Sequence, residues 1–181
     1  SLKYNLSLNA KKTKVMVIDT HRTNNQHIMV EQETLEEVQS FVYLGSTVNT
    51  QCSSEQDIRK RIGLAKNMFN KLLTIWKSRN ISLALKARFL KSMVFPIATY
   101  GCESWAPTQR DRQRLTAFEM WCYRRILRVS WTEHKTNKWI LDKFGGKTYI
   151  LQHIAQRKMR MFGHIMRRDG LEKLIVQGSV G

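Results

Sequence analysis

Residues 53–77 read SSEQDIRKRIGLAKNMFNKLLTIWK, and this stretch has a clear helical pattern. Ser53 can supply an N-cap oxygen, and Glu55 and Asp57 suit the positive end of a helix. A helix is therefore predicted over about 55–78. Six apolar side chains recur at helical spacing and form one stripe: Ile58, Ile62, Ala65, Phe69, Leu72 and Trp76.

Further helices are predicted after this stretch. Ser82 can cap a second helix, and Pro96 should kink or end it because proline lacks an N–H donor and clashes with the preceding turn. The residues from Tyr100 to Trp105 form a turn around Gly101. Three later helices are predicted over about 108–129, 136–143 (stopped by Gly145-Gly146) and 149–168, the first with Leu115, Phe118, Cys122 and Ile126 facing inward.

The segment before residue 53 has the pattern of short strands and turns. Val15 to Ile18 is a β-rich run, 20–26 is a polar loop, and extended stretches follow near 27–31 and 38–47. These features predict a small antiparallel β-meander. So small a sheet buries too little surface to be stable alone, so we expect it to pack on strands outside this chain. The predicted fold class is α+β, with the meander followed by a mainly helical part.

The charge of the chain is unevenly distributed. The 181 residues carry a net charge of +17, yet residues 1–52 hold five Lys or Arg and five Asp or Glu. The remaining 26 basic residues face nine acidic ones after residue 52. Such a concentration of positive charge attracts polyanions, and without base-reading motifs it indicates contacts to phosphate backbones.

The sequence lacks the residue clusters of several common functional classes. Cys52, Cys102 and Cys122 are widely spaced, and no zinc spacing occurs; Cys122 is expected to be a small buried apolar residue. His164 has no second ligand at metal-binding spacing, since His153 lies eleven residues away. No apolar run of membrane-spanning length and no signal peptide occur, so a reducing, intracellular setting without a membrane is expected.

Two short segments carry a family resemblance. Asn9-Ala10-Lys11-Lys12-Thr13 has the N-x-x-K-T spacing, and Phe41-Val42-Tyr43-Leu44-Gly45-Ser46 has the pattern F-x-Y-L-G-S. In this order they resemble motif D and motif E, the primer-grip hairpin, of the reverse transcriptases of non-LTR (LINE-type) retrotransposons. The resemblance is closest to the subgroup whose reading frame pairs an endonuclease with the polymerase.

Three later segments extend the resemblance over nearly the whole chain. Residues 100–105 resemble the Y-G-x-E-x-W turn of the thumb, and 124–127 and 162–167 resemble the R-R-I-L and F-G-H-x-x-R elements that follow it. The resemblance implies three parts. They are the end of the palm over 1–52, a helical thumb over 53–130, and a linker region over 131–181 that is expected to be truncated.

By this resemblance, the complete protein is an RNA-directed DNA polymerase, a nucleotidyltransferase that uses Mg²⁺ and deoxynucleoside triphosphates. The catalytic aspartates of the family lie upstream of motif D, in motif A and a Tyr-x-Asp-Asp motif C. This chain has no Asp-Asp pair. We therefore expect a fragment, without metal or cofactor of its own, that binds nucleic acid but does not polymerise.

The resemblance assigns roles to residues of the first part. Lys12 would act as the general acid that protonates the departing pyrophosphate; the alternative is a solvated lysine in a basic cluster. Asn9 and Thr13 are interpreted as turn-forming and strand-capping residues. The expected primer-grip residues are Phe41, Tyr43, Leu44 and Gly45, with Gly45 allowing close approach of the backbone and the two aromatics packing within the sheet or stacking on a base.

The helical part is expected to clamp a template–primer duplex through its phosphates. Arg124 and Arg128 repel each other at i,i+4, and an external anion would relieve that repulsion. A merely solvated basic face is the alternative, although acids are too few to pair these charges. Glu103 is interpreted as a structural carboxylate bonded to an arginine or a helix end. The candidate phosphate contacts are Lys66, Lys71, Arg124, Arg125, Arg128, Arg157 and Arg160.

The implied partners are an RNA template, a DNA primer and the rest of the palm and fingers, in the nucleus and cytoplasm. One alternative is a stand-alone basic helical module, derived from such an element, that binds RNA or DNA as its whole function. Another is a translated relic without selected function. The first 52 residues should distinguish the fragment from the module, because only in a fragment should they expose apolar sheet surface.

Overall fold

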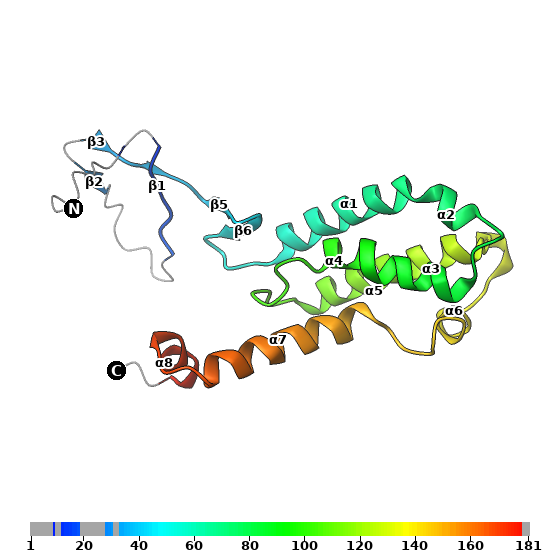
Figure 1. Cartoon of the computed structure of the whole chain (residues 1–181). Helices are drawn as coiled ribbons and strands as arrows, with labels where there is room; N and C mark the ends of the chain where they lie inside the picture. The colour runs from blue at the N-terminus through cyan, green and yellow to red at the C-terminus, as the bar shows by residue number, and fades with distance from the viewer. Residues whose placement is uncertain (1–8, 10–11, 19–27, 31–32, 179–181) are drawn as a thin grey trace. The chain divides into compact units, whose positions relative to one another are not determined.

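The computed structural model describes residues 9, 12–18, 28–30 and 33–178. The chain divides into two compact units, Ser1–Gln56 and Asp57–Gly181, whose strands and helices are labelled in Figure 1. We call them the strand unit and the helical unit. Strands occur in the first and helices fill the second, so the predicted α+β class is confirmed.

The described strands of the strand unit form three two-stranded pairs. β2 (Met29–Val30) with β3 (Glu33–Thr34) and β5 (Ser40–Tyr43) with β6 (Ser46–Asn49) are antiparallel, as predicted. β1 (Lys14–Val15) instead pairs in parallel with β4 (Glu36–Glu37), so a single antiparallel meander does not form. An ion pair of 2.9 Å between Lys14 and Glu36 stabilises this parallel register.

The expected β-rich run over Val15 to Ile18 is only partly a strand. β1 ends at Val15, and Val17 and Ile18 are exposed. Val15 still accepts a hydrogen bond of 2.9 Å from the Val38 N–H, which continues the parallel pairing. The predicted loop over 20–26 lies outside the described residues.

The β5–β6 hairpin closes through a two-residue turn. Tyr43 pairs with Ser46, and the intervening Leu44 and Gly45 have φ of 48° and 83°. Two successive positive φ values are characteristic of a type I′ turn, whose twist suits a hairpin. Glycine adopts this conformation freely, whereas leucine pays about 1–2 kcal/mol for it.

The helices follow the predicted order. The predicted helix over 55–78 is divided at Leu72, and a final short helix was not predicted. The bounds are α1 Glu55–Lys71, α2 Leu73–Lys77, α3 Leu83–Phe89, α4 Phe95–Ala98, α5 Gln109–Leu127, α6 Asn137–Asp142, α7 Ile150–Met166 and α8 Leu171–Gln177, with a π-helical turn at Leu90–Val94 and a 3₁₀ turn at Trp131–Glu133.

Local side-chain chemistry explains where these helices begin and end. Ser82 and Thr136 accept hydrogen bonds from the backbone at the starts of α3 and α6, and Thr108 and Asp111 form a reciprocal capping box on α5. Pro96 lies in the first turn of α4, where its missing N–H costs nothing, and the π-helical turn precedes it. The predicted interruption at Pro96 is therefore confirmed.

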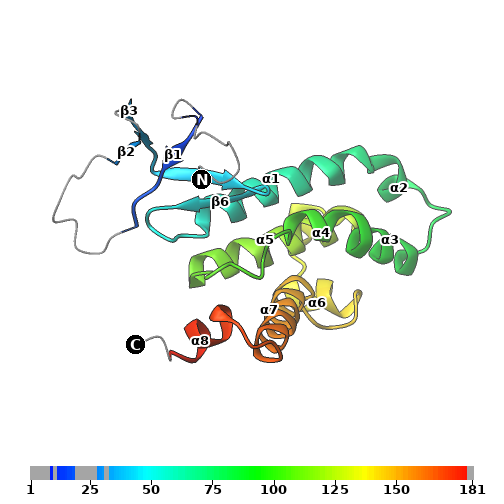
Figure 2. The ribbon, with the colours of Figure 1, turned by 60° about the vertical axis from the view of Figure 1, so that its left-hand side comes forward.

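The helical unit has one hydrophobic core. Figure 2 shows α1 and α2 on one side of α3, α4 and α5, and α7 on the other. The predicted stripe of α1 faces this core, since Ile58, Ala65, Phe69 and Trp76 are buried. The four inward residues predicted on α5 are buried as well, including Cys122, whose pKa is raised by burial.

The turn at residues 100–105 ties α1 to α7. The Trp105 indole N–H donates to Asp57 Oδ2 at 3.0 Å, and Lys158 Nζ donates to the Trp105 carbonyl at 2.6 Å. Glu103 forms an ion pair with Arg157, so the prediction of a structural carboxylate bonded to an arginine is confirmed. One turn thereby holds two helices that lie far apart in the sequence.

A buried carboxylate fixes the start of α7. Glu119 of α5 is fully buried and accepts hydrogen bonds from the backbone N–H groups of Tyr149 at 2.6 Å and Ile150 at 3.1 Å. The Tyr123 hydroxyl donates to the same side chain at 2.9 Å. These bonds satisfy N–H groups that the first turn of a helix leaves without partners.

No described helix is long and apolar enough to cross a membrane.

Candidate nucleic-acid interface

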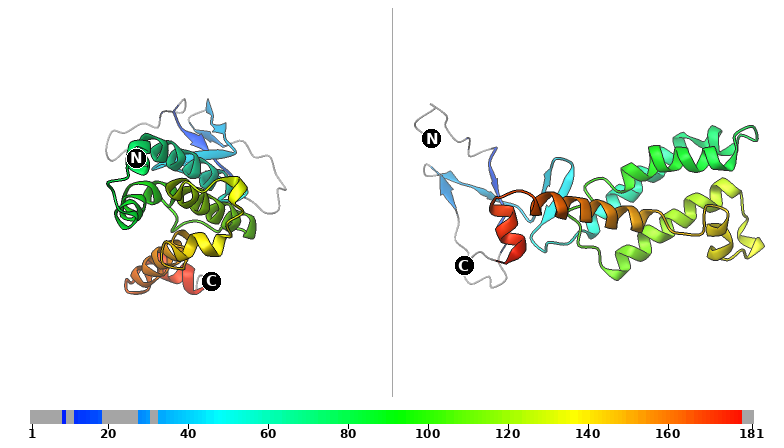
Figure 3. Two further views of the ribbon diagram at one scale, coloured as in Figure 1. Left: turned by 90° about the vertical axis from the view of Figure 1, so that its right-hand side faces the viewer. Right: turned by 60° about the horizontal axis from the view of Figure 1, so that its bottom comes forward.

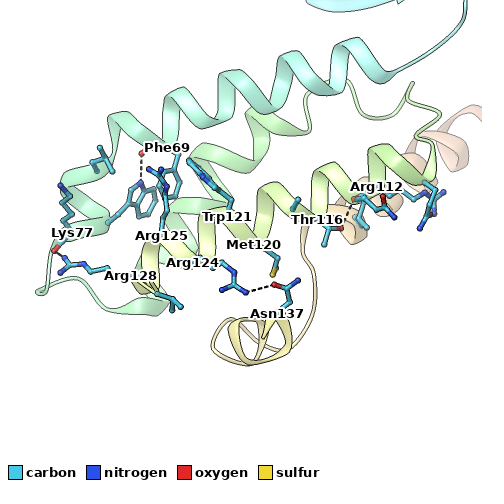
Figure 4. A pocket seen from close by; sticks show the side chains of 17 residues that line it. Phe69, Lys77, Arg112, Thr116, Met120, Trp121, Arg124, Arg125, Arg128 and Asn137 are labelled. Atoms are coloured by element: carbon cyan, nitrogen blue, oxygen red, sulfur yellow. Dashed lines mark hydrogen bonds between the residues drawn. The ribbon is translucent and has the colours of Figure 1, made fainter. Parts of the chain in front are cut away.

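A groove of about 1260 Å³ lies between α2, α5 and α6 of the helical unit, as shown in Figure 4. We call it the α5 groove. Buried and half-buried apolar side chains, Trp76, Met120 and Trp121 among them, line its inner part. As far as the structure describes them, its lining residues include no Asp or Glu. The basic residues that line it are Lys77, Arg112, Arg124, Arg125 and Arg128.

Two predicted phosphate contacts meet at Trp121. The Arg125 guanidinium carbon lies 4.4 Å from the centre of this ring, and Lys66 Nζ of α1 lies 5.5 Å from it. Both distances are within the range of a cation–π interaction. Trp121 thus contacts two cations from different helices. Arg125 lines the α5 groove, and Lys66 lines a neighbouring hollow that shares Trp121.

Trp121 itself was missed by the sequence analysis. It is half-buried and packs against Phe69 and Phe118, with ring centres 5.0 and 6.1 Å away. The signal that could have found it is its spacing, because Trp121 precedes Arg125 by one helical turn. An aromatic at that distance from an arginine can support it directly.

Arg124 and Arg128 are held by oxygens of the chain itself. Arg124 donates to the Lys135 carbonyl at 2.8 Å and to Asn137 Oδ1 at 3.1 Å. Arg128, which ends α5 with a φ of 56°, donates to the Lys77 carbonyl. The expected need for an external anion to offset their repulsion is therefore met in part from within the fold. The remaining guanidinium donors still line the α5 groove.

The other predicted phosphate contacts lie elsewhere in the helical unit. Lys71 lines a separate hollow beside Leu64 and Ile97. Arg157 and Arg160 of α7 line a hollow of about 890 Å³ next to the turn at residues 101–104. The structure thus gathers Arg124, Arg125 and Arg128 around the α5 groove. Lys66 lines a neighbouring hollow that shares Ala117 and Trp121 with it, and the other three predicted contacts lie in separate hollows.

Lys12 lies in a turn of the strand unit. Its N–H donates to the Asn9 carbonyl at 3.1 Å and is also 3.2 Å from Asn9 Oδ1. The Thr13 N–H and hydroxyl donate to the same carbonyl at 3.0 and 2.9 Å. The turn-forming role of Asn9 and Thr13 is confirmed. The Lys12 side chain is exposed, and its role as a general acid stays a prediction.

The predicted primer-grip residues form the exposed end of the β5–β6 hairpin. Phe41 and Tyr43 face their cross-strand partners Val48 and Ser46, yet remain 45% and 63% exposed. Leu44 at the turn is 77% exposed. An apolar side chain that is both exposed and held at positive φ is unfavourable for the isolated hairpin, which is typical of residues retained for contact with a partner.

Metal-binding geometry was searched across the described part of the chain. No group of three or more His, Cys, Asp or Glu side chains comes together there in a way that could hold a metal ion.

One comparison with known proteins gives a match. The chain is 24% identical, over 140 residues, to an uncharacterized transposon-derived protein of Caenorhabditis elegans. The match covers 75% of this chain and 50% of that protein, so the chain spans about half the length of this relative. No family model matches the chain, and no solved structure matches it. The likeness supports an origin in a transposable element.

Proposed function

We propose that the chain is the C-terminal part of the reverse transcriptase of a non-LTR retrotransposon, and that it binds a template–primer duplex through the α5 groove. The observation that carries the proposal is the basic α5 groove together with Trp121 at its border, a ring that Arg125 of the groove and Lys66 of the neighbouring hollow both contact. The transposon-derived relative and the resemblance to motifs D and E support the same origin.

The physical basis of binding is electrostatic. Cations held at a groove without carboxylates keep their charge available for phosphates, and binding releases counterions from the nucleic acid. Trp121, Arg124 and Arg128 are positioned by the fold, so little side-chain freedom is lost on binding. The duplex would be held without reading its sequence.

The strand unit has a different role in this proposal. Phe41, Tyr43 and Leu44 would contact the primer end or the rest of the palm, and Lys12 would lie near the reacting phosphates. Catalysis, with Mg²⁺ as the metal and deoxynucleoside triphosphates as substrates, would belong to the complete enzyme, which would act in the nucleus and cytoplasm. Template-dependent incorporation by this chain alone in a primer-extension assay would contradict the assignment.

Charge reversal of the two cations that contact Trp121 tests the binding site. We expect K66E/R125E to weaken binding of an RNA–DNA duplex about tenfold or more and to lower the log–log salt slope by about 1.4–1.8. The double variant K60E/R88E is a matched control, since both residues are exposed on neighbouring helices and the change in net charge is the same. Equal losses in the two variants would show that only net charge matters.

A second candidate is a stand-alone nucleic-acid-binding module. The closed core of the helical unit favours it, because that unit buries its own apolar surface. Limited proteolysis separates the two candidates. A module should resist cleavage in both units, whereas a fragment should lose the strand unit first and keep residues 57–178 as a stable product.

A further inference from the structure

Helix α7 carries a row of basic and imidazole side chains that the α5 groove does not use. His153, Arg157, Arg160, His164 and Arg167 follow one another at alternating steps of four and three residues, which places them on one face of the helix. We call this set the α7 row. Its fourteen-residue span is about 21 Å at about 1.5 Å per residue. Figure 3 shows α7 along its length.

The α7 row lines a hollow of its own. All five side chains border the space of about 890 Å³ beside the turn at residues 101–104. The lining residues of this hollow and those of the α5 groove do not overlap. The helical unit therefore presents two basic surfaces that a ligand could occupy independently.

Most of the positive charge of the α7 row is left for a ligand. Among the described residues that line the hollow, Glu103 is the one carboxylate, and its ion pair is with Arg157. Arg160 and Arg167 are exposed. A Cβ on Gly163 would lie 3.5 Å from an Arg167 terminal nitrogen, an ordinary contact distance, so the guanidinium lies against the helix beside this glycine.

His153 lies at one end of the α7 row, where its surroundings favour the neutral imidazole. Its ring stacks on Tyr149, with centres 5.3 Å apart. Burial lowers the pKa of His153, and the neighbouring Arg157 and Arg160 lower it further. A neutral imidazole can still donate one hydrogen bond to a phosphate oxygen, and a bound anion would offset the repulsion from the arginines.

We propose that the α7 row is a second phosphate-backbone site, so that one chain binds two nucleic-acid segments at once. This inference rests on the proposed function and extends it. The linear spacing favours a polymer, because a small anion would need donors that converge on one point. The span of about 21 Å corresponds to about six steps of a B-form strand at about 3.4 Å each.

A bridging experiment tests the proposal on the full chain. One duplex is immobilised, the chain is bound, and retention of a second, fluorescent duplex is measured, with stoichiometry per chain from analytical ultracentrifugation. We expect two duplexes per chain for the wild type. Both R160E/R167E and K66E/R125E should bind one duplex and lose bridging, while the control K60E/R88E should retain two.

Each other outcome has a defined meaning. A wild type that binds one duplex, or an R160E/R167E variant that still binds two, would overturn the α7 row while leaving the α5 groove intact. Displacement of one duplex by poly-glutamate as readily as by free duplex would overturn its assignment to nucleic acid. Absence of any duplex binding would overturn the proposed function itself. Unchanged circular dichroism melting of R160E/R167E would show that the variant is folded.

Discussion

The helical unit and the strand unit solve the problem of stability in different ways. The helical unit buries aromatic and aliphatic side chains from α1, α2, the π-helical turn, α4, α5, α6 and α7 in one core. Inside this core, the carboxylate of Glu119 accepts three hydrogen bonds. The described strands of the strand unit are two to four residues long, and apolar side chains such as Val42 and Leu44 remain exposed.

This difference indicates which unit can hold binding side chains in fixed positions. Surface cations are positioned well only where the elements beneath them are rigid, and the helical unit provides such a base. Exposed apolar residues on a hairpin instead indicate a surface that needs a partner. This contrast agrees with the roles proposed above, in which the helical unit binds the nucleic-acid duplex and the strand unit contacts the primer end or the rest of the palm.

Removing Glu119 should have the largest effect, because it breaks the polar interior of the helical unit. We expect Glu119→Ala to lower the free energy of unfolding by about 3 kcal/mol or more, since the N–H groups of Tyr149 and Ile150 and the Tyr123 hydroxyl lose their acceptor. Urea unfolding followed at 222 nm measures the change. The exposed Glu172→Gln serves as control and should change the value little; a similar loss there would contradict the account.

Asp111 should have a smaller effect that depends on pH. Its burial favours the neutral acid, but the hydrogen bonds from Thr108 and the ion pair with Arg114 outweigh this and lower its pKa below the usual 3.8. A lowered carboxyl pKa contributes stability above the unfolded pKa, and this contribution is lost as the pH falls through the folded pKa.

We therefore expect Asp111→Asn to cost about 1 kcal/mol near neutral pH, and the difference from wild type to shrink below about pH 4. Urea unfolding at a series of pH values measures it. Asp142→Asn, at an exposed position of α6, is the control. A difference that stays constant down to low pH would show that the hydrogen-bonded carboxylate is not its source.

Substitution of Leu44 should give the smallest change in stability, and it tests whether the backbone conformation of the turn destabilises the β5–β6 hairpin. Asparagine tolerates positive φ better than leucine, so Leu44→Asn is expected to stabilise the β5–β6 hairpin by about 0.5–1 kcal/mol. Hydrogen exchange of the hairpin amides measures this directly. Leu44→Ala removes the same apolar surface without relieving the backbone, so it should give no gain. Equal protection in both variants would refute the conformational explanation.

Local sequence patterns predicted those features of the helical unit that depend on interactions between residues close together in the chain. The α1 stripe, the caps at Ser82 and Thr136, and the burial of Cys122 follow from spacing and side-chain chemistry within a few turns. The parallel pairing of β1 with β4 could not be read in this way. It joins Lys14 to Glu36, which are 22 residues apart in the sequence, and strand direction depends on contacts that no local window contains.

The candidate site shows the same limit. Lys66, Arg124, Arg125 and Arg128 were identified from charge and from family resemblance, but charge alone does not tell which cations share a surface. Lys66 and Arg125 contact the same Trp121 ring because of how α1 and α5 pack. Lys71, only five residues after Lys66, lies in another hollow because a helix turns its side chains around its axis.

The sequence by itself determined the α+β class, the main helices with several of their ends, and the location of the positive charge after residue 52. These properties depend on composition and on spacing along one chain segment. Only the tertiary structure decided that the cations divide between the α5 groove and the α7 row, and that Arg124, Arg128 and Arg157 already have partners within the fold. The physical reason is that hydrogen bonds and cation–π contacts act over a few ångströms in space, whatever the separation of their residues in the chain.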